Sequence, residues 1–258
     1  MTILDSILLG ILQGFTEFLP ISSSGHLVLA EYLLGVSTPG LVFEVTVHLG
    51  SLISILIVFW QDIKEILLSL HDRSTRHLIL VLVVGTIPAV MVGLLFKDWF
   101  AAAFDNIALV GATLMLTGII LISTRFAKAK NAELTYFNGL IIGIAQSLAI
   151  TPGISRSGST IAAGLILGIS SKSAARFSFL LAIPAIVGAG LLTGLEIVST
   201  ANANIFSIEN IIAFFTSLVV GVFALKWLLK TLKAGKFHWF GIYCLFVGLI
   251  TLIGYSVT

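Results

Sequence analysis

Long apolar stretches set the strongest limit on what this chain can fold into. Six of them approach the roughly twenty residues that a helix needs to cross a bilayer, and they cover 43–60, 77–96, 107–124, 177–195, 208–229 and 239–257. With 58% hydrophobic and only 10% charged residues, the chain has too few polar side chains to cover a water-soluble globule of its length. The sequence therefore predicts an all-α polytopic membrane protein with six transmembrane helices.

Two further apolar segments, 7–19 and 137–150, are too short to cross a bilayer. Each is followed closely by a proline, Pro20 or Pro152, then by a turn rich in Ser and Gly and a second short apolar piece. This pattern is typical of a re-entrant helical hairpin. Because lipid cannot satisfy the free backbone groups of such turns, we expect both turns to be buried in protein or to line a wet cavity.

The two hairpins are similar to one another when the chain is shifted by 133 positions. The matching pairs are Gly10 and Gly143, Gln13 and Gln146, Ser22 and Ser155, Ser24 and Ser157, and Gly25 and Gly158. Each hairpin precedes three predicted spans, and an odd number of crossings places the second copy upside down in the membrane. We interpret 1–258 as one membrane domain built from inverted repeats of approximately 1–130 and 131–258.

The basic residues predict how the chain is oriented. Twelve of the fourteen Lys and Arg residues fall on one side of the predicted spans, which is then the cytoplasmic side. Both termini and the mouth of the first hairpin are expected outside, and the second hairpin enters from the cytoplasm. The basic residues are scattered and the net charge is only +2, so no nucleic-acid partner is expected. Cys244 is interpreted as a small buried side chain.

The first hairpin collects groups suited to acid–base chemistry. Gln13 and Glu17 are four residues apart, so they share a helix face that points toward Ser22–Ser24 and His26. An ionisable side chain at membrane depth indicates a functional site. Glu44 and His48 are also four residues apart, and two interpretations are open. Either both side chains face the same cavity, or Glu44 is an acidic residue at the start of a helix and His48 is an imidazole at the membrane interface.

The second hairpin carries a cation among hydroxyls. Arg156 has no acidic residue within ten positions, and the surrounding hydroxyls belong to Ser155, Ser157, Ser159 and Thr160. A guanidinium offers a planar fork of donors to phosphate oxygens, and we expect the N-terminus of a helix near Thr160 to add to it. The run predicts a phosphate site, although serines also serve helix packing in membranes.

Two other phosphate motifs do not fit the second hairpin. In the spacing of a P-loop, Ser159 stands where the phosphate-binding lysine is required, so ATP binding is not supported. In the pattern of acid-phosphatase-type lipid phosphatases, Ala162 stands where the second histidine is required. The chain matches neither.

Three segments resemble one known family. The run from Gln13 to Glu17 matches an (E/Q)xxxE motif, Ser23 to His26 matches SxGH, and Pro152 to Thr160 matches PGxSRSxxT. These are motifs of the bacterial undecaprenyl pyrophosphate phosphatases of the bacitracin-resistance type, which the chain resembles over nearly its whole length. The resemblance implies a bacterial plasma-membrane enzyme that needs a divalent cation. It would dephosphorylate the polyprenyl pyrophosphate carrier, recycle it for peptidoglycan synthesis and give bacitracin resistance.

The resemblance and the chemistry together suggest roles for the site residues. We expect Glu17, Ser23, His26 and Arg156 to be catalytic, and the phosphates to contact Ser24, Ser155, Arg156, Ser157 and Thr160. A Mg²⁺ or Ca²⁺ ion would be held by Glu17, Gln13 and largely by the substrate phosphates. His26 is expected to be the base and Glu17 to orient its imidazole or bind the cation. Ser23, a water molecule and His26 itself all remain open as the nucleophile.

Two expectations concern the protein as a whole. Inverted repeats that meet at the midplane are also the design of transporters, so a carrier or flippase of a phosphorylated lipid is the alternative function. The stretch 187–194 contains three glycines, which permits close helix association and a homodimer. The phosphate is expected to leave on the exterior side, because the carboxylate-bearing hairpin opens there.

Overall fold

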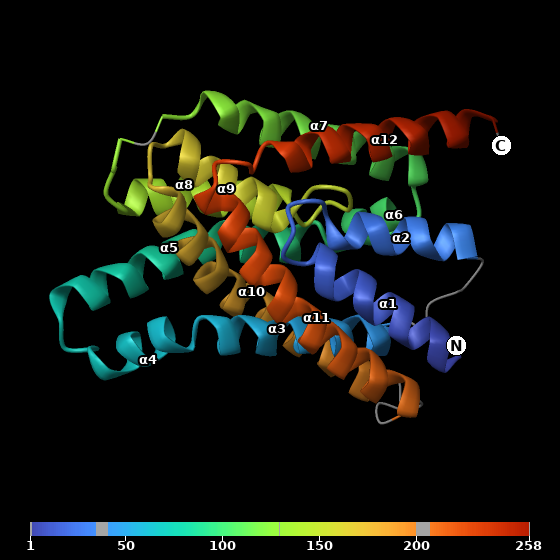
Figure 1. Ribbon diagram of the computed structural model, residues 1–258. Coiled ribbons are helices and arrows are strands. Elements are labelled where there is room, and N and C mark those ends of the chain that lie inside the picture. Colours follow the sequence, from blue (N-terminus) through green and yellow to red (C-terminus); the bar gives the residue numbers. More distant parts are fainter. Residues whose placement is uncertain (1, 35–40, 129, 200–206, 258) are drawn as a thin grey trace.

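The computed structural model describes residues 2–34, 41–128, 130–199 and 207–257, and its ordered elements within these ranges are helices (Figure 1). Their bounds are α1 Ile3–Thr16, α2 Ser23–Leu34, α3 Leu41–Val58, α4 Trp60–Leu68, α5 Arg73–Leu95, α6 Lys97–Phe104, α7 Ile107–Ser123, α8 Tyr136–Leu148, α9 Arg156–Ile166, α10 Ser171–Ser199, α11 Ile208–Lys233 and α12 Trp239–Val257. The predicted all-α fold class is confirmed.

Five helices of the described chain, α5, α7, α10, α11 and α12, are long and apolar enough to cross a membrane. A sixth span results if α3 and α4, which are bent by 70° at Phe59, are taken together. The bend has a physical cause, because α4 carries Asp62, Lys64 and Glu65 and all of its residues are at least partly exposed. The predicted first span therefore ends where the sequence becomes charged.

The two short apolar helices, α1 and α8, are each turned back by a second short helix, as expected for re-entrant hairpins. The α8–α9 turn needs Gly153, whose φ is +89° and whose added Cβ would overlap Thr113. Threonine hydroxyls of α7 satisfy the free carbonyls of this turn: Thr113 donates to Pro152 at 2.6 Å and Thr117 to Gly153 at 2.8 Å. The turn is thus buried in protein, as its backbone requires.

The hairpin helices pack on the opposite halves of the chain in a reciprocal way. A Cβ added at Gly10 in α1 would lie 2.9 Å from the carbonyl oxygen of Ala213 in α11. The matching glycine of α8, Gly143, lies so close to Gly85 of α5 that a Cβ would overlap the Gly85 carbonyl. Because α5 and α11 are the second long helices of the two predicted units, each unit's hairpin packs on the other unit.

Helices α7 and α12 lie side by side and run in opposite directions (Figure 1). A Cβ added at Gly118 would lie 2.7 Å from the Gly241 carbonyl oxygen, and one added at Gly248 would lie 2.6 Å from that of Gly111. Residues late in α7 thus pack against residues early in α12, so the two helices are antiparallel. These are the last helices of the two predicted units, so their antiparallel packing agrees with an inverted repeat. The boundary near residue 130 stays an interpretation.

The two hairpin turns meet midway along the bundle (Figure 1). A Cβ added at Gly25 would lie 3.0 Å from Cα of Gly153, and one added at Gly158 would lie 3.2 Å from Cβ of Pro20. Gly25 corresponds to Gly158, and Pro20 to Gly153, under the shift of 133 positions. The contact is therefore reciprocal as well, and it brings together the segments that carry the predicted site residues.

Candidate functional site

Glu17 is the centre of the site. It follows the last residue of α1 and is buried between the two hairpins. Its Oε1 lies 2.6 Å from Nη2 of Arg156, and its Oε2 accepts hydrogen bonds from Ser23 Oγ at 2.7 Å and Gln13 Nε2 at 3.1 Å. The structure thus joins four of the predicted site residues through one carboxylate.

A second imidazole approaches the same carboxylate. Nε2 of His48 in α3 lies 3.7 Å from Oε2 of Glu17, and its Nδ1 lies 2.7 Å from the backbone oxygen of Glu44. Of the two interpretations of the Glu44 and His48 pair, the shared cavity is the one that His48 fits. Glu44 contributes its carbonyl, which fixes the orientation of the His48 ring.

His26 has different partners from those expected. Its Nδ1 lies 2.8 Å from the carbonyl oxygen of Ser22, and its Nε2 lies 2.8 Å from the hydroxyl of Tyr243 in α12. The imidazole that faces Glu17 is therefore that of His48. The Ser22 carbonyl is the acceptor four residues before His26 at the start of α2, and it binds both the backbone amide and the ring of His26.

Arg156 begins α9, so the helix starts four residues earlier than the expected position near Thr160. Ser155 is the reason, because it acts as N-cap and its Oγ accepts a hydrogen bond from the Gly158 amide at 3.1 Å. Within the described chain, Nη1 of Arg156 and Oγ of Ser159 are buried without a hydrogen-bond partner. Buried donors of this kind require an explanation, and a phosphate at the helix N-terminus supplies one.

The other predicted phosphate contacts differ in where their hydroxyls point. Ser157 Oγ lies 3.4 Å from Ser155 Oγ and 3.5 Å from the Leu19 carbonyl of the first hairpin. Ser24 Oγ lies 3.3 Å from Ser22 Oγ, on the opposing turn. These groups remain next to the contact between the hairpins.

Thr160 has turned away from that contact. Its Oγ1 lies 2.6 Å from Ser178 Oγ in α10 and donates to the Arg156 carbonyl at 2.8 Å, and the residue is completely buried. The structure gives Thr160 a role in attaching α9 to α10. Its contact with a phosphate stays a prediction that this geometry does not favour.

The donor set near Glu17 suits a hard cation. Among the described residues no group of three or more His, Cys, Asp and Glu side chains is arranged to hold a metal ion. Oε1 of Gln13 is nevertheless buried without a partner beside Glu17. A carboxylate and an amide oxygen are ligands that Mg²⁺ and Ca²⁺ prefer, with the remaining positions left to substrate oxygens.

Sequence reasoning missed Tyr243, which is separated from His26 by 217 positions. It also missed the α7 threonines that close the second turn. A hydroxyl in an apolar helix has no local pattern that reveals its tertiary partner. Only the pairing of α12 with the first hairpin could have pointed to Tyr243.

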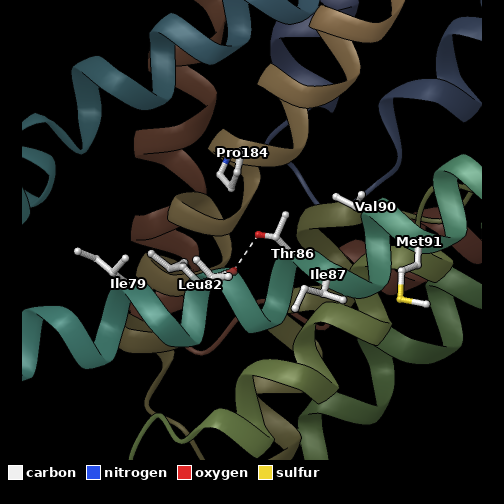
Figure 2. Close-up of a pocket in the computed structure, with 8 residues that line it drawn as sticks. Ile79, Leu82, Thr86, Ile87, Val90, Met91 and Pro184 are labelled. Carbon is white, nitrogen blue, oxygen red and sulfur yellow. Dashed lines mark hydrogen bonds between the residues drawn. The ribbon is translucent and has the colours of Figure 1, made fainter.

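The groove between α5 and α10 is a separate feature (Figure 2). It has a volume of about 360 Å³, and its lining residues are Ile79, Leu82, Val83, Thr86, Ile87, Val90, Met91 and Pro184. The hydroxyl of Thr86 donates to the Leu82 carbonyl at 2.8 Å, so the lining of the groove is almost entirely apolar. It contains none of the groups needed for phosphate chemistry.

The sequence is similar to known proteins over nearly its whole length. The model of the family described as "Bacitracin resistance protein BacA" matches residues 6–250. The chain belongs to the BacA family. An undecaprenyl-diphosphatase of Halothermothrix orenii is 44% identical over 256 residues, with 98% of each chain covered. One of Desulforapulum autotrophicum is 40% identical with 98% of each chain covered. Undecaprenyl-diphosphatase 2 of Bacillus thuringiensis is 37% identical with 97% covered.

Membership of the BacA family agrees with the structure in two respects. The matched region includes the second hairpin, the first hairpin except for the first three residues of α1, and the complete long helices α5, α7, α10 and α11. The three motifs that carried the resemblance lie on the two turns that touch each other. The relatives from Halothermothrix orenii and Desulforapulum autotrophicum both carry the name undecaprenyl-diphosphatase.

Proposed function

We propose that this protein hydrolyses undecaprenyl diphosphate to undecaprenyl phosphate and inorganic phosphate. The observation that carries the proposal is the 2.6 Å contact between Arg156 of one hairpin and Glu17 of the other, with Ser23 on the same carboxylate. A cation for the diphosphate, a nucleophile and a base thus meet at one point. The names of the relatives supply the lipid.

Binding uses donors that the protein leaves free. Nη1 of Arg156 and Oγ of Ser159 are buried without partners in the described chain, at the first turn of α9. A diphosphate oxygen placed there gains charge-assisted hydrogen bonds and the favourable end of the helix dipole. When the diphosphate binds the guanidinium of Arg156, it replaces Glu17 as the partner of that cation. The Glu17 carboxylate is then free to act in the reaction.

Ser23 is the nucleophile that the geometry supports best. Its Oγ donates to Oε2 of Glu17 at 2.7 Å, so the carboxylate can accept the proton as Oγ bonds to the terminal phosphorus. The bond from that phosphorus to the bridging oxygen breaks, and undecaprenyl phosphate leaves with this oxygen and the electron pair. A water molecule then attacks the phosphoserine, releasing phosphate and returning a proton to Ser23 Oγ.

His26 is less well placed to attack phosphorus. Both of its ring nitrogens have partners, the Ser22 carbonyl and the Tyr243 hydroxyl. His48, with Nε2 at 3.7 Å from Oε2 of Glu17, is the imidazole nearest to the carboxylate among those described. Glu17 therefore takes the role of base that was expected of His26.

A divalent cation, Mg²⁺ or Ca²⁺, would be held by Glu17, by the free Oε1 of Gln13 and by the substrate phosphates. When bound, it would neutralise charge on the phosphoryl oxygens and the leaving phosphate. Gln13 contributes its Nε2 to Glu17 at the same time, which holds the carboxylate in place.

The proposal extends to how the lipid is handled. The polyprenyl chain would remain in the bilayer while the diphosphate enters sideways, and the phosphate would leave on the exterior side of the plasma membrane. Recycling of the carrier for peptidoglycan synthesis and bacitracin resistance would follow. A homodimer through 187–194 is also part of the proposal, because an added Cβ at Gly188, Gly190 or Gly194 meets nothing within 4 Å.

Purified protein in detergent micelles tests hydrolysis without any possibility of transport. Wild-type protein should release phosphate from undecaprenyl diphosphate. Chelation of divalent cations should abolish this activity, and addition of Mg²⁺ or Ca²⁺ should restore it. The Arg156→Ala variant should elute from a size-exclusion column at the same volume as wild type, which shows that it is folded, and should release no phosphate. Binding of the lipid without phosphate release would instead support the transporter or flippase that an inverted repeat also permits.

A further inference from the structure

Tyr243 contacts the catalytic hairpin from the far end of the chain. It lies in α12, and its hydroxyl is 2.8 Å from Nε2 of His26. The two rings are also stacked, with centroids 5.6 Å apart and an angle of 11° between their planes. A hydrogen bond and a stacking contact together hold the imidazole in one orientation.

The partners of His26 determine which nitrogen carries its proton. The Ser22 carbonyl can only accept, so Nδ1 of His26, at 2.8 Å from it, is a donor. In the neutral ring, Nε2 is then an acceptor and the Tyr243 hydroxyl is its donor. The Ser22 carbonyl selects this tautomer, and removal of the Tyr243 hydroxyl takes away the donor to Nε2, which leaves the outer side of the ring without a partner.

The Ser22 carbonyl links His26 to the nucleophile. It accepts both the His26 ring at 2.8 Å and the His26 backbone amide at 3.2 Å. Ser22 has a φ of +71°, which is unfavourable for a residue other than glycine, so outside contacts must hold it there. Ser23, the next residue, presents its Oγ to Glu17.

Cys244, the residue after Tyr243, contacts the turn between α1 and α2 on the other side of Ser22. Cys244 is completely buried, and its Sγ lies 3.6 Å from the carbonyl oxygen of Pro20. Adjacent residues of α12 thus contact the turn on both sides of Ser22. The last helix of one unit holds the catalytic turn of the other.

We propose that Tyr243 is a positioning residue for the hydrolysis: it fixes His26, and through His26 it holds the Ser22 turn that aims Ser23 at Glu17. This inference rests on the proposed function and adds to it a residue from outside the motifs. Tyr243 acts on the rate of the chemical step and leaves the phosphate-binding groups on α9 unchanged.

The Tyr243→Phe variant retains the ring and deletes the hydroxyl. We expect kcat for phosphate release to fall about tenfold, as for loss of one hydrogen bond to a buried group, with KM within about twofold of wild type. Tyr32→Phe is the matched control, because it deletes an exposed phenol from α2. It should retain wild-type kcat and KM.

The His26→Ala background separates positioning from a general effect on stability. If Tyr243 acts through His26, Tyr243→Phe in that background should change kcat less than twofold. A full tenfold loss there, or wild-type kcat for Tyr243→Phe alone, would overturn the proposal.

A spectroscopic measurement needs no activity. In protein labelled with ¹⁵N-histidine, His26 should show the Nδ1–H tautomer in all three proteins, and its Nε2 resonance should shift in Tyr243→Phe but not in Tyr32→Phe, because only Tyr243→Phe removes the donor to Nε2. An unchanged His26 signal in Tyr243→Phe would also overturn the proposal. Absence of phosphate release by wild-type protein, with the shift of the Nε2 resonance present in Tyr243→Phe, would contradict the proposed function alone.

Discussion

Nη2 of Arg156 and Oε1 of Glu17 are 2.6 Å apart although 139 positions separate the two residues in the chain. The pair joins the two re-entrant hairpins where their turns meet. A buried ion pair is weak evidence for stability, because the desolvation of both charges offsets their attraction. Its position among free phosphate donors favours a role in the reaction.

Arg156→Lys should lower kcat/KM for phosphate release by about a thousandfold, as expected for an arginine that stabilises a transferring phosphoryl group. Lysine retains the charge but cannot contact Glu17 through one nitrogen and a phosphate through another. Steady-state phosphate release measures this. The exposed Arg125→Lys is the control and should match wild type; an Arg156→Lys variant with wild-type kcat/KM would show that charge alone suffices.

Ser23→Ala should reduce kcat at least a hundredfold, because both the nucleophile and its hydrogen bond to Glu17 are lost. Ser24→Ala, whose hydroxyl lies against Ser22, should lose less than tenfold. With substrate labelled in its terminal phosphate, rapid quenching in a denaturing detergent at neutral pH, which preserves both phosphoserine and phosphohistidine, should trap a phosphoserine at position 23 in wild type only. A phosphohistidine, or labelled Ser23→Ala protein, would exclude Ser23 as the nucleophile.

Gln13→Glu should strengthen the dependence on the divalent cation. The substitution replaces a donor to Glu17 by a second carboxylate, so the two acids repel one another unless a cation lies between them. We expect half-maximal activity at a several-fold lower concentration of Mg²⁺ or Ca²⁺, and lower residual activity after chelation than in wild type. An unchanged cation titration would place the ion away from Gln13.

Gly143→Ala should lower the free energy of unfolding by about 1–3 kcal/mol, the usual consequence of overpacking. Its Cβ would overlap the Gly85 carbonyl where α8 crosses α5. Gly93→Ala, in α5, is the matched control, because its Cβ would lie at an ordinary contact distance, 3.5 Å from Cδ1 of Ile150, and alanine favours a helix interior. Thermal unfolding in detergent compares the two; equal midpoints would show that the α5–α8 crossing is looser than described.

Much of the fold follows from the sequence because hydrocarbon length and the needs of backbone groups in lipid leave few alternatives. The spans and both hairpins were predicted on these grounds. The bend at Phe59 was not, because the charges that begin at Asp62 mark the end of the apolar span but do not reveal that a second helix continues at an angle of 70°. The start of α9 at Arg156 was misplaced because the cap formed by Ser155 depends on a turn that α7 closes from outside.

The site was partly predictable because motifs preserve chemistry that is local to each turn. Glu17 and Gln13 share a helix face, and Arg156 was placed near them by the expected contact of the hairpins. The partner of His26 was not predictable, because Tyr243 reaches it only through the packing of α12. Thr160 fits the motif by its position, yet its hydroxyl points to Ser178, which the sequence pattern does not reveal.

The central claim is that Glu17 and Arg156 work as one unit across the two hairpins. The most direct test is the rate of phosphate release from undecaprenyl diphosphate by Glu17→Gln, Arg156→Ala and the double variant. Residues that act together are strongly non-additive, so the double variant should be no slower than the slower single variant. Losses that multiply in the double variant, or a single variant with wild-type rate, would contradict the account.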